Sequence, residues 1–185
     1  MRVGRCSGMI RTDSAWHRQP PVQKGDLGED IVQRIFERVG WQCYKPASAG
    51  AHAIDFICIK NNETFYLEVK TKRLRKLYPD TGFPLRNYKT YKELSKNEGK
   101  RIYIAFVDIG AMQVYGNFLD VLDMPRIVKY NRDGHTYTKL YPCNDMDYRK
   151  GEDIRFFPRP AMNVIADLRE MNLTDDELRI LRQMV

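Results

Sequence analysis

Three charged residues interrupt an apolar segment of the chain in a pattern that could bind a metal ion. In "IDFICIKNNETFYLEVK", residues 54–70, the charges of Asp55, Glu68 and Lys70 lie among residue types that are typical of strands. Carboxylate oxygens are the ligands that Mg²⁺ and Mn²⁺ prefer. An amine beside such a cation could assist the hydrolysis of a phosphate ester. The segment is therefore the candidate catalytic centre.

The spacing of these residues predicts that they meet on one face of a β-hairpin. Asn-Asn at 61–62 suits the positive φ angles of a two-residue turn. Aligned on that turn, Asp55 faces Glu68 with Cβ atoms roughly 5 Å apart, and Lys70 lies roughly 6–7 Å further along the same face. Two carboxylates this close repel each other, more strongly when buried. A divalent cation between them would reverse the sign of that interaction.

A plainer interpretation of the same residues stays open at this point. Lys70 could form an ordinary ion pair with one carboxylate on a half-exposed strand. A functional site is favoured because the turn, the spacing and the preceding helical pattern agree with one another, and such local consistency is informative.

The segments around the hairpin predict one α/β domain. An apolar face recurs at helical spacing over residues 25–39, and the glycine at position 40 ends that helix. Residues 1–24 show no periodicity and are interpreted as a flexible N-terminal arm. Further elements are predicted as strands at 42–47, 53–60, 63–70 and 101–109, a helix at 85–98, a hairpin at 126–142 that turns at 131–134, and a helix from a capping box at Thr174–Glu177. Residues 25–185 would form a single domain, with its core at about 25–120 and a C-terminal elaboration at about 121–185.

The composition narrows the class of protein. The chain has 185 residues, of which 43% are hydrophobic, and its formal net charge is +7. This hydrophobic fraction allows a sizeable core, and the positive charge favours a polyanionic partner such as DNA. No apolar run approaches the roughly 20 residues of a membrane span, and the first residues lack the apolar region of a signal peptide. The four cysteines are widely spaced, without a CxxC pair, which fits a cytoplasmic protein better than a disulfide scaffold or a zinc site.

Basic residues follow the candidate centre directly. The loop after Lys70 and the predicted helix at 85–98 carry cations suited to sequence-independent phosphate contacts, and tyrosines are interleaved on the helix. For the helix, a solvated face with its tyrosines in the core is the alternative. The residues expected to contact DNA are Lys72, Arg73, Arg75, Lys76, Lys89 and Lys92.

The Asp…Glu-x-Lys pattern resembles the motif of the PD-(D/E)XK nuclease superfamily. The matching residues are Asp55 in "AID" and Glu68 and Lys70 in "EVK", after a helix that carries Glu29 in "GDLGE". The segment "PASAGAHAID" also looks like the loop before the aspartate in archaeal Holliday-junction resolvases. Ile54 stands where the family often has a proline. That proline is not a metal ligand, so its absence weakens the match to the motif more than it affects the implied chemistry.

The resemblance implies both a fold and an activity. It covers roughly residues 25–110 and implies the restriction-endonuclease-like α/β fold, with a mixed central sheet of four or five strands flanked by helices. A C-terminal β-hairpin and helices would be added to this core. The implied activity is that of a deoxyribonuclease, and more narrowly an endonuclease, that depends on Mg²⁺ or Mn²⁺.

The resemblance also implies roles for individual residues. Asp55 and Glu68 would hold the metal together with the backbone carbonyl of Val69. Lys70 would position or deprotonate the attacking water, or stabilise the negative charge that develops during the reaction. Which of these Lys70 does, and whether one or two metal ions bind, stays open.

Two further side chains could reach the site. Glu29 has two interpretations of equal weight: it supports the metal, or it closes a helix-capping box that begins at Asp26. Gly28, near the centre of the same apolar face, would let the helix approach the sheet closely. His52, three residues before Asp55, is interpreted as a loop histidine.

Two other functions stay open on the sequence alone. The chain could be a catalytically inactive nucleic-acid-binding relative, although the complete set of Asp55, Glu68 and Lys70 argues against this. It could also be a structural or partner-binding protein whose carboxylates hold a stabilising ion. A monomer and a homodimer are equally compatible with the sequence.

Overall fold

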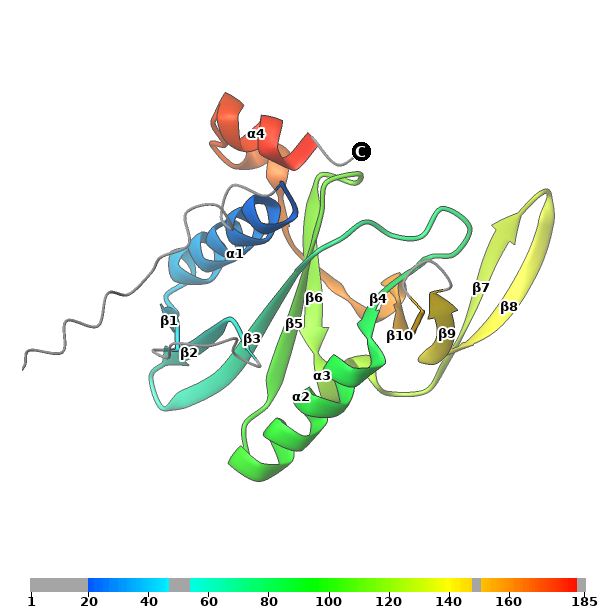
Figure 1. Ribbon diagram of the computed structural model, residues 1–185, viewed down its shortest axis with the longest axis horizontal. Coiled ribbons are helices and arrows are strands. Elements are labelled where there is room, and N and C mark those ends of the chain that lie inside the picture. Colours follow the sequence, from blue (N-terminus) through cyan, green and yellow to red (C-terminus); the bar gives the residue numbers. More distant parts are fainter. Residues whose placement is uncertain (1–19, 47–53, 148–150, 183–185) are drawn as a thin grey trace, which may run out of the picture.

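The computed structural model describes residues 20–46, 54–147 and 151–182, and its centre is a mixed six-stranded β-sheet (Figure 1). The strand order is β1-β2-β3-β5-β6-β11, and a second sheet has the order β4-β10-β9. The helices are α1 (Pro20–Arg38), α2 (Leu85–Glu98), α3 (Leu119–Leu122) and α4 (Asp175–Arg182), with short 3₁₀ helices at Arg159–Ala161 and Leu168–Glu170. The strands are β1 (Gln42–Tyr44), β2 (Phe56–Lys60), β3 (Glu63–Thr71), β4 (Asp80–Pro84), β5 (Ile102–Asp108), β6 (Gln113–Phe118), β7 (Arg126–Arg132), β8 (His135–Tyr141), β9 (Cys143–Asp147), β10 (Glu152–Pro158) and β11 (Asn163–Asp167).

The β2–β3 hairpin has the predicted register. Lys60 pairs with Glu63 and Phe56 pairs with Leu67, and Asn61 takes a positive φ of 53° in the turn. Because a two-residue turn fixes which residues face each other, the register was readable from the sequence. The ladder stops at Phe56, so Asp55 stands at the end of the hairpin beside the far half of β3.

The strand β5 lies at the centre of the core, since its seven residues are all buried. Its side chains alternate between two hydrophobic clusters, one on each face of the sheet. Tyr103, Ala105 and Val107 join the cluster that includes α1 residues. Ile102 and Ile104 join the cluster that includes Tyr91 of α2. The sheet is therefore covered by α1 on one face and by α2 on the other.

A crossover through α2 makes β5 run parallel to β3. The helix ends where it was predicted to end, because Gly99 adopts a left-handed φ of 62° that glycine tolerates best. The crossover leaves the C-terminal half of β3 and the N-terminal half of α2 close together, which matters for the site.

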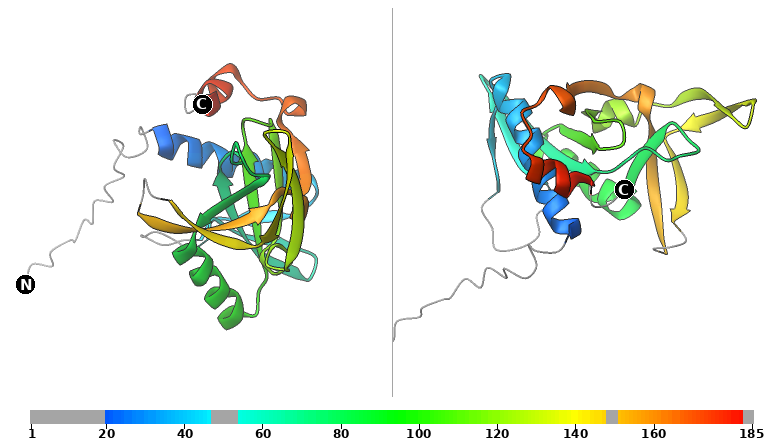
Figure 2. Two further views of the ribbon diagram at one scale, coloured as in Figure 1. Left: turned by 90° about the vertical axis from the view of Figure 1, so that its right-hand side faces the viewer. Right: turned by 90° about the horizontal axis from the view of Figure 1, so that it is seen from above.

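The predicted C-terminal hairpin and terminal helix are present. The strands β7 and β8 form the hairpin, with positive φ angles at Asp133 and Gly134 in its turn. It projects from the end of the molecule opposite α1 and β1 (Figures 1 and 2). The capping box before α4 is formed in both directions, since Thr174 N donates to Glu177 Oε2 at 2.6 Å and Glu177 N donates to Thr174 Oγ1 at 3.2 Å.

Three features differ from the sequence predictions. The helix α1 begins at Pro20, inside the segment interpreted as an arm that ends at residue 24. The basic segment at 71–84, predicted to be a loop, ends in the strand β4. The central sheet has six strands because β11 adds to the free edge of β6. The remainder of the predicted arm, residues 1–19, and His52 lie outside the described residues.

The strand β4 was missed because only a distant partner makes it a strand. Its sequence, "DTGFP", has the composition of a turn. It pairs with β10, which follows about 70 residues later in the chain. Gly82 is required there, because a Cβ atom at this position would lie 2.1 Å from the carbonyl oxygen of Arg155.

Candidate active site

Asp55 and β3 are held together at the open end of the hairpin. The backbone N–H of Asp55 donates to the Leu67 carbonyl at 3.1 Å. The Asp55 carboxylate in turn accepts a hydrogen bond from the Val69 backbone N–H, with 2.7 Å between nitrogen and Oδ2. These two contacts fix the Asp55 side chain beside the Glu68–Lys70 segment.

Glu68 lies below the surface and is held from two sides. Its residue is only 4% exposed. Its Oε1 accepts hydrogen bonds from the Lys70 amine and from the Tyr91 hydroxyl, the latter at 2.6 Å. Its Oε2 is buried and has no hydrogen-bond partner among the described residues. A buried carboxylate oxygen without a partner is costly, so this atom is a candidate position for a cation or a proton.

The electrostatics of the two carboxylates agree with that interpretation. Burial, and secondarily the charge of Glu68, raises the pKa of Asp55 to about 6. Burial also raises the pKa of Glu68, although Lys70 and Tyr91 act in the opposite direction. Both groups are therefore less stable as anions in the folded protein than in water, and a bound divalent cation would relieve this cost.

A cavity of about 350 Å³ opens beside these groups, between β3 and the N-terminal half of α1. Gly28 allows the close approach of helix and strand that was expected, because a Cβ atom there would lie 2.0 Å from Thr71 Oγ1. Glu68 is not among the lining residues, whereas Lys70, whose amine pairs with it, is one of them. The lining residues are Lys24, Gly25, Glu29, Asp55, Val69, Lys70, Thr71 and Lys72.

Glu29 lies in the wall of this cavity and does not cap α1. The helix begins six residues before Asp26, so the predicted capping box is wrong and both acids lie inside the helix. The Glu29 carboxylate pairs with the Lys45 amine at 2.9 Å. The pKa of Glu29 is raised, mainly by burial, although the ion pair with Lys45 acts in the opposite direction. Of its two interpretations, support of a metal is the one that remains.

The donor set suits a small, hard cation that keeps some of its water. The part of the chain that the structure describes contains no cluster of three or more His, Cys, Asp or Glu side chains arranged to hold a metal. The remaining candidate ligands are the carboxylates of Asp55 and Glu68 and the backbone carbonyl of Val69. Mg²⁺ is commonly held by one or two carboxylates and retains several waters, so these residues fit Mg²⁺ or Mn²⁺ and do not fit zinc.

Lys24 is a site residue that sequence reasoning missed. It lies in the segment interpreted as an arm, where no periodicity marked a helix. In the structure it lines the cavity, is only 9% exposed, and has a pKa lowered by burial and secondarily by Arg73. A cation held at this position would attract an anionic group that enters the cavity.

The predicted DNA-binding residues occupy different environments. Lys72 lines the cavity, and its amine donates to the Gly82 carbonyl at 3.0 Å. Arg73 and Lys76 are exposed in the segment between β3 and β4. On α2, Lys89 is exposed, whereas the Lys92 amine pairs with Asp123 at 3.1 Å.

Arg75 has a structural environment that its neighbours lack. Its guanidinium makes two hydrogen bonds of 2.6 Å to the buried Asp80 carboxylate. It also lies over the rings of Phe156 and Tyr78, at 3.6 and 4.3 Å from the ring centroids. A guanidinium held in this way supports the β4–β10 region, and its expected contact with DNA stays a prediction.

The altered pKa of Asp55 predicts how stability depends on pH without metal. Its folded value of about 6 lies above the unfolded value of about 4, so the folded state binds this proton more tightly. The resulting stabilisation is complete below pH 4 and is lost as the pH rises through 6. Relative to Asp55→Asn, the unmodified protein should therefore lose about 2–3 kcal/mol of unfolding free energy between pH 4 and 7.5. Urea unfolding in EDTA at several pH values measures this difference, and a constant difference would contradict it.

Searches with the sequence found no matching protein-family model and no similar curated protein. A structural comparison matched Hjc, a Holliday junction resolvase from the archaeal hyperthermophile Archaeoglobus fulgidus. The sequence identity is 13%, the TM-score is 0.43, and the match covers 62% of this chain and 87% of that chain. None of the described helices has the length and apolar character needed to cross a membrane.

Proposed function

We propose that the protein is a metal-dependent deoxyribonuclease whose catalytic centre is formed by Asp55, Glu68 and Lys70. The observation that supports this most directly is the pair of desolvated carboxylates, one just before β2 and one on β3. One of the two has a buried oxygen without a hydrogen-bond partner among the described residues. A structural ion pair alone would not require the second carboxylate. An endonuclease is the finer form of this proposal.

The roles of the residues follow from where they lie. Asp55, Glu68 and the Val69 carbonyl would hold Mg²⁺ or Mn²⁺, with Glu29 in support. The ion, when bound, would lower the pKa of a water molecule and neutralise charge on the phosphate. The Lys70 amine lines the cavity and would stabilise the negative charge that develops on the reacting phosphate. Lys24 and Lys72 line the same cavity and would attract the DNA backbone to it.

One cleavage assay tests the proposal directly. The full chain is incubated with linear, circular, single-stranded and branched DNA in Mg²⁺, in Mn²⁺ and in EDTA. We expect cleavage of at least one of these DNAs with either cation and none in EDTA. Nicking of the circular DNA would show endonuclease activity. Absence of cleavage under all of these conditions would contradict the proposal.

A catalytically inactive DNA-binding protein is the second candidate. It is favoured by the Lys70–Glu68 ion pair, which occupies one carboxylate oxygen. It is also favoured because the described residues contain no group of three or more His, Cys, Asp or Glu side chains arranged to hold a metal. This candidate predicts DNA binding that is equal in Mg²⁺ and in EDTA, with no cleavage in either.

The basic segment after β3 gives a prediction for DNA binding. Replacing Lys72, Arg73 and Lys76 with glutamine should weaken binding and reduce the log–log salt slope by about 0.9 for each lost contact to duplex DNA. Arg75→Gln, in the same segment, is the variant with which the triple variant is compared. It should cost about 3 kcal/mol of stability, because Asp80 loses its buried partner. Fluorescence anisotropy at several salt concentrations measures the slope. An unchanged slope in the triple variant would mean that these residues are ordinary solvated cations.

A further inference from the structure

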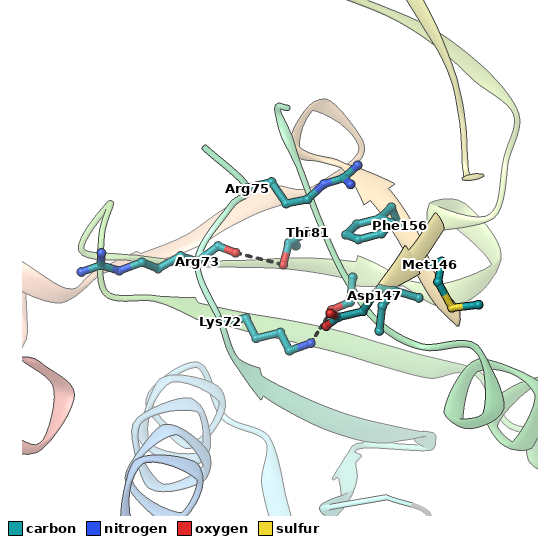
Figure 3. Close-up of a pocket in the computed structure, with 9 residues that line it drawn as sticks. Lys72, Arg73, Arg75, Thr81, Met146, Asp147 and Phe156 are labelled. Atoms are coloured by element: carbon teal, nitrogen blue, oxygen red, sulfur yellow. Dashed lines mark hydrogen bonds between the residues drawn. The ribbon is translucent and has the colours of Figure 1, made fainter. Parts of the chain in front are cut away.

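A second cavity, of about 500 Å³, lies next to the candidate active site and shares Lys72 with it. It is formed between the segment that follows β3 and the sheet of β4, β10 and β9 (Figure 3). Its volume is in the range of sites that enclose small organic ligands. The proposed nuclease function does not assign a role to this cavity.

The cavity has an apolar wall and a polar one. Ile154 and Phe156 of β10 form a buried part of the wall, and Met146 of β9, which is 44% exposed, lies at its margin. Figure 3 shows Phe156 and Met146 at one side, and the Asp147 carboxylate beside the Lys72 amine, which donates to the Gly82 carbonyl at 3.0 Å. The Arg75 guanidinium, which also lines the cavity, lies over the Phe156 ring and is held by Asp80, so the two groups form one fixed surface.

This combination of groups matches the chemistry of a nucleotide. A nucleobase has flat apolar faces, which pack well against aromatic and methionine side chains. Its edge carries N–H donors, and a carboxylate such as that of Asp147 can accept several hydrogen bonds at once. The phosphate attached to the same nucleotide would lie toward Lys72, on the side of the catalytic cavity. A base inside a duplex cannot enter such a pocket, since it is stacked and paired.

We infer that this cavity binds one unpaired nucleotide of the substrate, adjacent to the phosphodiester at Asp55 and Glu68. The inference rests on the proposed function and adds the kind of DNA that the site selects. Lys72 follows Lys70 by two residues, which corresponds to roughly 7 Å along an extended strand, so one nucleotide can contact both cavities. DNA with an unpaired nucleotide at the cleavage point is therefore the preferred substrate.

The first test compares two DNA duplexes that differ in one base. Each carries a single unpaired residue, which is an adenosine in one duplex and an abasic residue in the other. Binding is measured by anisotropy with Ca²⁺ in place of Mg²⁺. The unmodified protein should bind the adenosine form about tenfold more tightly, since stacking and edge contacts of one base are worth about that factor. Equal affinity for the two duplexes would overturn the inference.

The second test removes one side chain from the cavity wall. Met146→Ala truncates an exposed residue on the edge strand β9, where the change causes little strain. The variant should lose about threefold of the preference for the adenosine form, with unchanged affinity for the abasic form. Met124→Ala is the matched control, because Met124 is 54% exposed and does not line the cavity. Thermal melting checks that both variants fold. A full tenfold preference in folded Met146→Ala would overturn the inference.

The two proposals can fail separately. A base-dependent preference without cleavage by any metal would contradict the nuclease proposal and leave the nucleotide pocket standing. Equal cleavage of fully paired and bulged duplexes, together with equal binding of the adenosine and abasic forms, would contradict the pocket and leave the nuclease proposal standing.

Discussion

Asp55→Asn is expected to lower metal-dependent DNA cleavage by at least ~10³-fold, because it removes a charged ligand of the proposed metal ion. The substitution keeps the shape of the side chain and its hydrogen bond from the Val69 N–H, so the fold should persist. It also removes the repulsion between Asp55 and Glu68. The melting temperature in EDTA at pH 7.5 should therefore rise, while the stabilisation of the protein by added Mg²⁺ should disappear.

Single-turnover cleavage and melting curves with and without Mg²⁺ measure these effects. Asp133→Asn is a suitable control, since the Asp133 side chain is 80% exposed in the β7–β8 turn and asparagine tolerates its positive φ. Glu68→Gln should behave like Asp55→Asn in both measurements. Full metal-dependent cleavage by both of these site variants would rule out the assignment of Asp55 and Glu68.

Lys70→Ala should separate catalysis from binding. We expect cleavage to fall by roughly 10²-fold or more, because the amine no longer stabilises charge in the reacting phosphate. Metal affinity should rise, since the ammonium group that pairs with Glu68 in the unmodified protein no longer opposes the cation. DNA binding should change little, because Lys24, Lys72 and the exposed cations after β3 remain.

The measurements are single-turnover cleavage at saturating Mg²⁺, metal titration by calorimetry, and DNA binding in Ca²⁺. Lys70→Arg should not restore full activity, because a planar guanidinium fills the site differently and does not act as a base. The control is Lys100→Ala, which changes an exposed lysine after α2. If Lys70→Ala lost binding and cleavage in equal proportion, Lys70 would position the substrate and its catalytic role would be wrong.

The position of the two carboxylates proposed for catalysis was predictable because their geometry is local. Thirteen positions separate Asp55 from Glu68, and the two-residue turn between them fixes which residues face each other. The confirmed register of Lys60 with Glu63 brings Asp55 beside Glu68 without any help from the rest of the fold. The sequence alone also determined the end of α2 at Gly99, since a left-handed residue is needed there.

The tertiary structure decided how far the residues of the candidate site are buried. Whether Glu68 is exposed or buried depends on α2, which places the Tyr91 hydroxyl on its carboxylate from 23 residues away. The wall that contains Lys24 and Glu29 depends on how closely α1 approaches β3. The capping-box interpretation of Glu29 was wrong because local sequence offers a plausible start for a helix at Asp26, while the helix continues back to Pro20.

Neither the second cavity nor the structural role of Arg75 could be predicted from the spacing of residues in the sequence. In the sequence, Arg75 is one of several cations in a basic segment, and nothing local distinguishes it from Arg73 or Lys76. It becomes a structural residue only because β4 pairs with β10 and so fixes Asp80 and Phe156 around its guanidinium. The hairpin register is set by a two-residue turn, whereas pairing across about 70 residues is set by the packing of the whole chain. The sequence by itself determined which candidate groups meet at the hairpin, and the tertiary structure decided their burial and what lies beside them.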